Sequence, residues 1–394
     1  MSLYGKQFES VDENDLLSLV DNQVIERKTL EYKESLPGNS DSEKREFLAD
    51  VSSFANGSGG HLILGIRETD GVPTELAGLE IANLDSEKLR LENIIRDGVE
   101  PRIPGVGIRE IPLKNKKVAI VIRVPRSWAL PHMVTFKAHS RFYSRNSAGK
   151  YPLDVSEIRA LFALSETTTE RIRNFRVERL ARIVARETPI VVNEGPKMVL
   201  HIIPLNAFDP AARFDVSPLG RNIPRPMYTS SWDGRINFDG FLSFRKSHDS
   251  PSARTYLQVF RNGSIEAVET LLLRASKDSG HEERLIPSVA YEKELLDALP
   301  RFLDIQRQLG VEPPLFVMLS LLDVADYAMA VDHSRFYWHD DYPIDRDSLL
   351  IPEVIVEGFR CDHAEVMRPI FDAVWNAAGW PRSMNYDEKG KWKG

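Results

Sequence analysis

The strongest structural signal in the sequence is the stretch Phe54-Ala55-Asn56-Gly57-Ser58-Gly59-Gly60-His61-Leu62-Ile63-Leu64-Gly65-Ile66. Its second half, residues 61–66, is almost entirely apolar, which is typical of a buried strand. The residues before it, 40–56, carry apolar side chains at helical spacing behind a serine and an aspartate that can cap a helix. Because glycine lets two backbones approach closely, the stretch predicts a helix that ends against a buried strand.

A short alternating segment, residues 30–34, lies upstream of this helix. Leu30 and Tyr32 alternate with Glu31 and Lys33. Successive side chains of a strand point to opposite faces, so Glu31 and Lys33 are predicted to lie side by side on one face.

The acids of this region suggest phosphodiester chemistry. Glu26 and Glu31 lie five residues apart, and Lys33 follows two residues later. Two carboxylates can hold a divalent metal, and a lysine can offset the charge that builds on phosphate. Taken alone, Glu31 and Lys33 fit an ordinary surface ion pair better. The position of Glu26 and the glycine-rich stretch together favour a functional site.

These residues resemble the Schlafen AlbA_2 domain, formerly called the divergent AAA-4 domain. Its motifs are E-x4-E-[FY]-K and A-[FY]-A-N-x-x-G-G-x-[IL]-x-[IL]-G-[IV], which align with residues 26–33 and 53–66. A third block, residues 141–147, resembles the closing strand of the family, Y-x-R-x-G-[ST], without its glycine. The resemblance ends near residue 161, and residues 190–394 show none.

The resemblance implies a catalytic role for Glu26 and Glu31 as ligands of Mg²⁺ or Mn²⁺. A third acid is expected just beyond the glycine-rich strand, in a G-[IV]-x-[DE] context, and Glu68 fits that position. Asp70 is the alternative, although aspartate before glycine is a favoured turn residue. The catalytic set is therefore predicted as Glu26, Glu31, Lys33 and Glu68, with the three glutamates holding the metal.

Five basic or aromatic side chains near the closing strands are candidates for nucleic-acid contact. Arginine and lysine can contact phosphates, and tyrosine can stack on a base. An edge strand protected by charge explains them equally well. They are Lys137, Arg141, Tyr143, Arg145 and Lys150.

A long helix is expected over residues 166–187. Its arginines, among them Arg176 and Arg179, fall within about a third of the circumference at 100° per residue. This pattern indicates either a solvated helix face, since glutamates are interspersed, or a stripe that tracks phosphates.

The length of 394 residues allows two or three domains. We expect an α+β fold with a compact Schlafen/AlbA_2-like, mixed-sheet domain at residues 1–165 and a bridging helix at 166–189. A second α+β domain of unknown function is expected at residues 190–382, followed by a polar, disordered tail at 383–394.

Composition excludes several classes of protein. The net charge of −7 argues against bulk coating of nucleic acid, so a local basic surface is needed. The single cysteine, Cys361, excludes an internal disulfide and a multi-cysteine zinc site. No G-x-x-x-x-G-K-[ST] motif supports an ATPase. His333 and His339, near two aspartates, match no defined metal spacing, and a polar loop is the better interpretation.

The sequence has no apolar run near 18 residues, and residues 1–13 are polar, so we expect a cytoplasmic protein. The preferred hypothesis is a metal-dependent endoribonuclease that cleaves structured, tRNA-like RNA, in a toxin or anti-phage setting. The alternative is a non-catalytic AlbA_2-type regulator that binds DNA or RNA. Eukaryotic Schlafen proteins clamp RNA between two tandem copies of the unit. The single copy here therefore suggests a homodimer.

Overall fold

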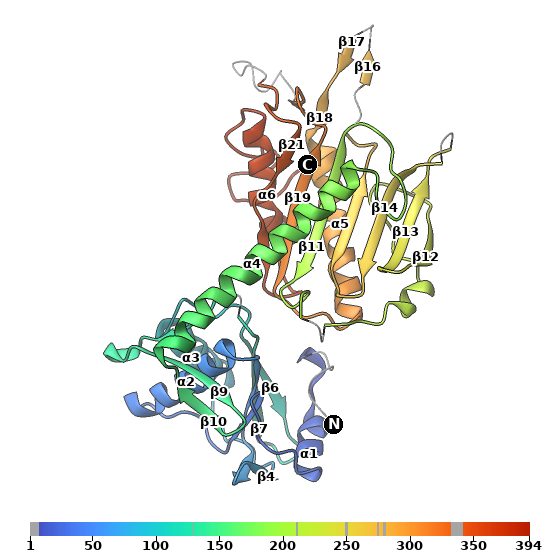
Figure 1. Cartoon of the computed structure of the whole chain (residues 1–394). Coiled ribbons are helices and arrows are strands. Elements are labelled where there is room, and N and C mark those ends of the chain that lie inside the picture. The colour runs from blue at the N-terminus through green and yellow to red at the C-terminus, as the bar shows by residue number, and fades with distance from the viewer. Residues whose placement is uncertain are drawn as a thin grey trace. The chain divides into compact units, whose positions relative to one another are not determined.

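The computed structural model describes residues 8–127, 129–209, 212–248, 251–273, 276–278, 281–331 and 342–394. The chain divides into two compact units, Met1–Glu170 and Arg171–Gly394, and Figure 1 labels many of their elements. It is 32% helical and 28% strand, which confirms the predicted α+β class.

The central sheet of the first unit has the order β1-β2-β7-β6. Its strands are β1 (Leu30–Lys33), β2 (Gly60–Leu64), β7 (Val118–Val124) and β6 (Gly107–Pro112). β1 and β2 are parallel and the other pairs are antiparallel. The sheet is therefore mixed, as predicted. A parallel pair needs a crossover connection, and α2 (Asp41–Asn56) supplies it.

The two faces of this sheet are covered by different helices. Alternate side chains of β2 and β7, such as Leu62 and Ile122, pack with Phe47 of α2 and with α3 (Leu84–Gly98). The intervening side chains, such as Ile63, pack with α1 (Glu13–Asp21). This alternation follows from the period of two in a strand.

A second sheet of the first unit has the order β10-β9-β8-β5. Its strands are β5 (Val99–Glu100), β8 (Met133–Val134), β9 (Arg141–Asn146) and β10 (Gly149–Pro152). The sequence of residues 136–138 and 141–144 predicts a closing hairpin. The structure instead has a 3-10 turn, η2 (Phe136–Ala138), and pairs β9 with β10. A further 3-10 turn, η1 (Phe8–Ser10), precedes α1.

A small hairpin extends beyond β2. It consists of β3 (Arg67–Thr69) and β4 (Val72–Glu75), joined by the predicted turn at Asp70 and Gly71. Both turn residues have positive φ angles, 52° and 76°, which suits aspartate and glycine.

Besides the helix expected at 166–187, the sequence predicts a helix over 154–164, with Asp154 and Glu157 as a capping box. The structure joins the two into one continuous helix, α4 (Val155–Val184). No glycine or proline interrupts residues 155–184, so nothing in the sequence ends a helix there. The boundary between the units falls inside this helix, between Glu170 and Arg171, whereas we expected it at residue 165.

The second unit is built on an eight-stranded antiparallel sheet of order β12-β13-β14-β15-β11-β19-β21, with β22 also paired to β19. Its strands are β11 (Lys197–Pro204), β12 (Asp233–Ile236), β13 (Gly240–Lys246), β14 (Ala253–Phe260), β15 (Ile265–Glu269), β19 (Leu315–Leu322), β21 (Ser348–Leu350) and β22 (Val354–Val356). In the sequence, Asp233-Gly234 and Asn262-Gly263 are both strong hairpin-turn signals. Asn262-Gly263 joins β14 to β15 as a turn, as predicted. Asp233-Gly234 was wrongly predicted as a turn, because it begins β12.

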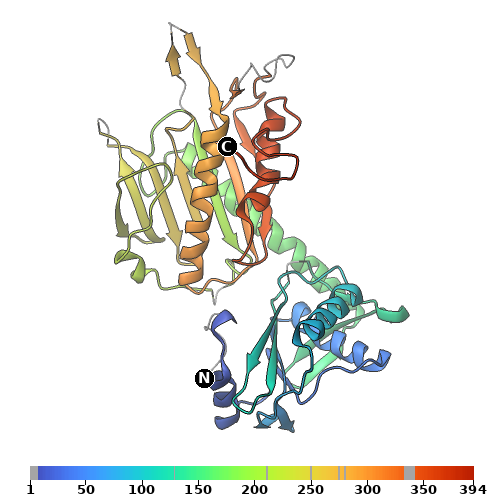
Figure 2. The ribbon, with the colours of Figure 1, turned by 180° about the vertical axis from the view of Figure 1, so that it is seen from behind.

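Helices cover both faces of this sheet. α5 (Ser288–Gln308) and α6 (His363–Ala377) pack on one face, where Leu200 and Ile202 point. The C-terminal part of α4 packs on the other face, against Val199 and Tyr256. Figures 1 and 2 show α4 and α5 on opposite faces.

Shorter elements complete this unit. They are η3 (Ser217–Gly220) and the small pairs β16 (Ser276–Asp278) with β17 (His281–Glu283) and β18 (Leu285–Pro287) with β20 (Ala328–Ala330).

The C-terminal residues 383–394 are folded, in contrast to the expected disordered tail. Tyr386 is buried, and the indole N–H of Trp392 donates to Glu292 of α5 at 2.7 Å. Ser383 donates to the same carboxylate at 2.7 Å. The two aromatic side chains give this polar segment enough apolar surface to pack. Among the described residues, no helix is both long and apolar enough to cross a membrane.

Candidate functional site

The glycine-rich stretch has a structural role. A Cβ on Gly60 would lie 2.5 Å from the ring of Phe54 and 2.6 Å from the carbonyl oxygen of Thr29. Gly59 has a φ of 70°. Only glycine fits such contacts and angles without displacing neighbours. The stretch therefore brings the end of α2 close to β2.

Asn56, the last residue of α2, connects this helix to the second sheet. Its amide nitrogen donates to the carbonyl groups of His132 and Tyr143, both at 2.8 Å. Its amide oxygen accepts the backbone N–H of His132 at 2.7 Å. The asparagine thus positions β8 and β9 over α2, and with them the side chains of the site.

Glu31 is the centre of a charged cluster beneath β9. One of its carboxylate oxygens is 2.6 Å from the ammonium of Lys33, and the other accepts a hydrogen bond from Arg145. Arg145 is buried and lies over the ring of Phe54, at 4.0 Å from its centroid. Burial raises the pKa of Glu31, but the charges of Arg145 and Lys33 outweigh it and hold the pKa below its usual value.

A second acid of this cluster, Asp50, was missed in the sequence. It lies on α2, is 2% exposed, and accepts a hydrogen bond from Lys150 at 2.7 Å. Its pKa is raised by burial and by the charge of Glu31, against the charge of Lys150. The signal was present, because Asp50 falls on the apolar face of the predicted helix, between Phe47 and Phe54.

Glu26 and Glu68 approach this cluster through the β3–β4 turn. Glu26 accepts the backbone N–H of Tyr32 at 2.7 Å, and Glu68 accepts that of Gly71 at 2.6 Å. Gly71 also accepts the backbone N–H of Glu26 at 2.7 Å. Burial raises the pKa of Glu26, with smaller contributions from the charges of Glu31 and Glu68. The three predicted acids therefore lie in one electrostatic neighbourhood.

In this arrangement the three predicted acids are already engaged by other groups of the protein. Mg²⁺ and Mn²⁺ need several oxygen atoms that converge on one point. Here Glu31 already binds two cations, while Glu26 and Glu68 each accept a backbone N–H group. Within the described ranges, no group of three or more His, Cys, Asp or Glu side chains could hold a metal. Metal binding by Glu26, Glu31 and Glu68 stays a prediction.

Three of the predicted nucleic-acid contacts lie at the surface of the first unit. Lys137 and Arg141 are exposed, and Tyr143 is half-buried. The remaining two are engaged elsewhere, because Arg145 is buried against Glu31 and Lys150 is paired with Asp50 and Glu46. In this arrangement, Arg145 and Lys150 support the site and do not face a ligand.

An aromatic pair that the sequence analysis missed lies beside these residues. The rings of His139 and Tyr143 are stacked, with centroids 6.2 Å apart, and Nε2 of His139 is 2.9 Å from the tyrosine hydroxyl. Burial and the charges of Arg45 and Arg141 lower the pKa of His139, so both arginines lie near the ring. We refer to the group as the β9 patch; it comprises Arg45, Lys137, His139, Arg141 and Tyr143.

Arg176 and Arg179 do not form a solvent-facing stripe. Arg179 is buried and donates two hydrogen bonds of 2.8 Å to Glu266 of β15. Arg176 is buried as well and donates to the carbonyl oxygen of Ile351 at 2.7 Å. Both predicted interpretations of this helix face were therefore wrong at these positions, because the arginines hold α4 to the sheet of the second unit.

The sequence singles out two further groups, of which the structure describes one. His333, His339 and the aspartates beside them lie outside the described residues. Cys361 is a partly buried free thiol whose pKa is raised by burial.

Comparison with known proteins identifies the N-terminal part of the chain. Residues 26–154 match the family model described as Schlafen, AlbA_2. No curated protein matches the chain. Among solved structures, the chain is similar to the DIP2311 protein from Corynebacterium diphtheriae, with 18% identity and a TM-score of 0.25. That match covers 35% of this chain and 26% of the other, so the chain spans about a quarter of that protein.

The resemblance seen in the sequence is thus confirmed for the N-terminal part, whose family indicates a role related to nucleic acid. Residues 26–154, about a third of the chain, are similar to the Schlafen AlbA_2 family.

Proposed function

We propose that the first unit binds nucleic acid at the β9 patch, and that its ligand is RNA with unpaired bases. The observation that carries this proposal is the stacked pair of His139 and Tyr143 with arginines beside it. Proteins that bind single strands without sequence preference combine aromatic side chains, on which bases stack, with basic side chains that contact the phosphates. Loops of structured RNA present unpaired bases, as in a tRNA-like ligand.

The charge distribution supports a local site of this kind. The whole chain carries a net charge of −7, so attraction to phosphate must come from a limited surface. Arg45, Lys137 and Arg141 provide three cations around the aromatic pair. Lys137 lies 3.7 Å from Asp41, and its side chain is 64% exposed, so this pairing is weak and can be exchanged for a phosphate.

Binding to a hairpin RNA and to a fully paired duplex of the same length tests the proposal. We expect the hairpin to bind more tightly, with log affinity falling against log salt by about 0.7 per phosphate contact. Arg141→Ala should weaken binding and reduce that slope by about 0.7. Lys114→Ala is the matched control, because Lys114 is 82% exposed in the turn between β6 and β7. Equal binding of both variants at every salt concentration would contradict the proposal.

A metal-dependent endoribonuclease is the second candidate. One observation favours it, namely the raised pKa of Glu26, which reflects burial and the nearby charges of Glu31 and Glu68. Acids crowded in this way are typical of functional sites. A metal would require Glu31 to release Lys33 or Arg145, which is why we place binding first.

Incubation with a hairpin RNA, with Mn²⁺ or Mg²⁺ and then with EDTA, distinguishes the two candidates. Cleavage that is lost with EDTA and in Glu31→Gln would support the nuclease. Intact RNA with unchanged binding in Glu31→Gln would support the binding protein. DNA of the same sequence, tested in parallel, decides between an RNA-binding and a DNA-binding regulator.

The nuclease candidate includes a homodimer, since the chain has one copy of the Schlafen AlbA_2 domain, and a role in a toxin or anti-phage system. Sedimentation velocity with and without RNA measures whether the homodimer forms. A monomer under both conditions would remove the two-copy clamp from the hypothesis. The role in a toxin or anti-phage system is measured by the growth of cells that produce the chain or its Glu31→Gln variant, with and without phage.

A further inference from the structure

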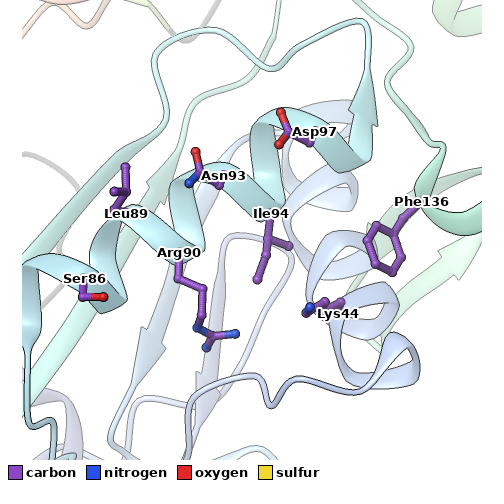
Figure 3. Close-up of a pocket in the computed structure, with 8 residues that line it drawn as sticks. All are labelled: Lys44, Ser86, Leu89, Arg90, Asn93, Ile94, Asp97 and Phe136. Atoms are coloured by element: carbon purple, nitrogen blue, oxygen red, sulfur yellow. The ribbon is translucent and has the colours of Figure 1, made fainter.

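A pocket of about 420 Å³ lies between α3, α2 and the η2 turn. One wall is the face of α3 that carries Leu89, Asn93 and Ile94, and the other consists of Lys44 and Phe136. Figure 3 shows Ile94, Phe136 and Lys44 converging from these three elements. The volume falls within the range of small-molecule sites, roughly 300–1,000 Å³.

Two polar groups of the pocket form no hydrogen bond or ion pair with any residue that the structure describes. They are the ammonium of Lys44 and the side-chain amide of Asn93, and both belong to half-buried residues. Arg90, by contrast, is held in place by Glu87 at 3.0 Å and by the carbonyl oxygen of Pro37 at 2.7 Å. The unused groups are one cation and one amide, which can both donate and accept.

The remaining surface of the pocket is apolar. Leu89 is 56% exposed, although it is a large aliphatic residue, and Phe136 is half-buried beside Ile94. Asp97 at the end of the pocket is paired with Arg96, with N–O distances of 2.9 and 3.3 Å. A ligand that fits has a flat apolar body, a hydrogen-bonding edge and a nearby negative charge. A nucleobase with its phosphate has all three.

The pocket and the β9 patch are formed by the same two segments of the chain. Lys44 of the pocket is followed by Arg45 of the patch, and Phe136 of the pocket is followed by Lys137 of the patch. A strand bound at the patch therefore passes next to the pocket. A single base could leave the strand and enter it.

We infer that this pocket binds one unpaired nucleobase of a strand held at the β9 patch, an inference that rests on the proposed function. Phe136 stacks on the base, Asn93 hydrogen-bonds its edge, and Lys44 contacts the adjoining phosphate. The patch contacts the phosphates and stacks on the bases of any single strand, and the pocket adds a contact with one further base.

Fluorescence anisotropy of the full chain with two probes tests the inference. One probe is a short single-stranded oligoribonucleotide, and the other has the same backbone without bases. Phe136→Leu keeps an apolar side chain in the core but removes the ring. Loss of one stacked base should weaken binding of the first probe about tenfold and leave the second unchanged. Asn93→Ala should act in the same direction, with Glu92→Gln on the exposed side of α3 as control.

The possible results separate this inference from the proposed function. If wild-type protein binds neither probe, both are overturned. If it binds the two probes equally, base contacts at the patch and in the pocket are both overturned. If Phe136→Leu and Asn93→Ala leave both probes unchanged or weaken them equally, the pocket inference fails and the patch remains. If AMP alone binds as tightly as the oligoribonucleotide and depends on Phe136, the pocket is a site for free nucleotides and the inference is overturned.

Discussion

Each of the two units contains a buried glutamate bound to an arginine, and the two clusters differ in what reaches solvent. In the second unit, Glu266 accepts hydrogen bonds from Arg179, His201 and Tyr256, and its side chain is 0% exposed. In the first unit, Glu31 is bound to Arg145 and to Lys33, and the side chain of Lys33 is 41% exposed.

This difference separates a structural cluster from a candidate site. Every oxygen of Glu266 is used within the core, so that cluster can only hold α4 to β15 and β11. The Glu31 cluster keeps one ammonium at the surface and has further acids beside it, Glu26 and Asp50. An ion pair as such therefore says little about function. What matters is whether one of its members can exchange its partner for a ligand.

The largest effect is expected for Glu266→Gln. The change leaves the buried guanidinium of Arg179 without its countercharge, which should lower the free energy of unfolding by about 3–5 kcal/mol. Urea titration followed by circular dichroism measures it. Arg182→Ala is the control, because it removes an exposed i,i+4 pair with Glu178 on the same helix, worth about 0.5 kcal/mol. A loss as small as that of the control would contradict a structural role.

The acid dependence of the same cluster follows from its pKa. Burial raises the pKa of Glu266, but Arg179 and His201 outweigh it and lower the value from 4.5 to about 2. A lowered pKa means that the folded state holds the proton less tightly than the unfolded one. The stabilisation is therefore complete above about pH 4.5 and is lost as the pH falls towards 2. Wild type and Glu266→Gln should converge in stability over that window.

Glu269 lies three residues after Glu266 and is also buried, but it has no cation partner among the described residues. It therefore shows what burial alone does to a glutamate of this sheet. It is 1% exposed and accepts the backbone N–H of Leu272 at 2.9 Å. Burial raises its pKa from 4.5 to about 7. The folded state therefore loses stability as the pH rises from 4.5 to 7, by at most about 3 kcal/mol.

Glu269→Gln should accordingly stabilise the protein at pH 8 and change little at pH 4. Thermal unfolding at the two pH values measures the difference. A variant that is equally destabilised at both would show that the carboxylate is ionised and stabilised in the core.

The local features of the first unit could be predicted from the sequence. The alternation of residues 30–33 gave the correct strand, and Ser40 with Glu43 forms the capping box that begins α2. The glycines between α2 and β2 correctly predicted that the end of the helix lies close to the strand. These features depend on residues within a few positions of one another, so the sequence pattern contains them.

The pairing of charges could not be predicted in this way. Arg145 binds a glutamate 114 residues away, and Lys150 binds an aspartate 100 residues away. Such pairs depend on how β9 and β10 pack on α2. The turn predicted at Asp233-Gly234 failed for a related reason. A Cβ on Gly234 would lie 2.7 Å from Ile223, so this glycine serves close packing within a strand.

Arg145→Met is expected to have an intermediate effect. Its side chain is 1% exposed, so the change removes a buried partner of Glu31 while keeping much of the apolar contact with Phe54. Lys33 still balances the charge of Glu31, and we therefore expect a loss of about 2 kcal/mol, below that of Glu266→Gln. Urea titration under the same conditions makes the two values comparable. A loss equal to that of Glu266→Gln would mean that the Glu31 cluster is as shielded from solvent as the Glu266 cluster.

Lys33→Met should have the smallest effect on stability, under about 1 kcal/mol, because its ammonium is partly hydrated and Arg145 remains on Glu31. Arg145→Met and Lys33→Met remove different partners from the carboxylate of Glu31. The difference between their losses in free energy of unfolding therefore isolates the effect of burying the partner. If Lys33→Met costs as much as Arg145→Met, exposure does not decide which partner can be exchanged, and the distinction between the two units loses its basis. If it costs little, Lys33 is the member of the cluster that can turn from Glu31 to a phosphate at low energetic cost.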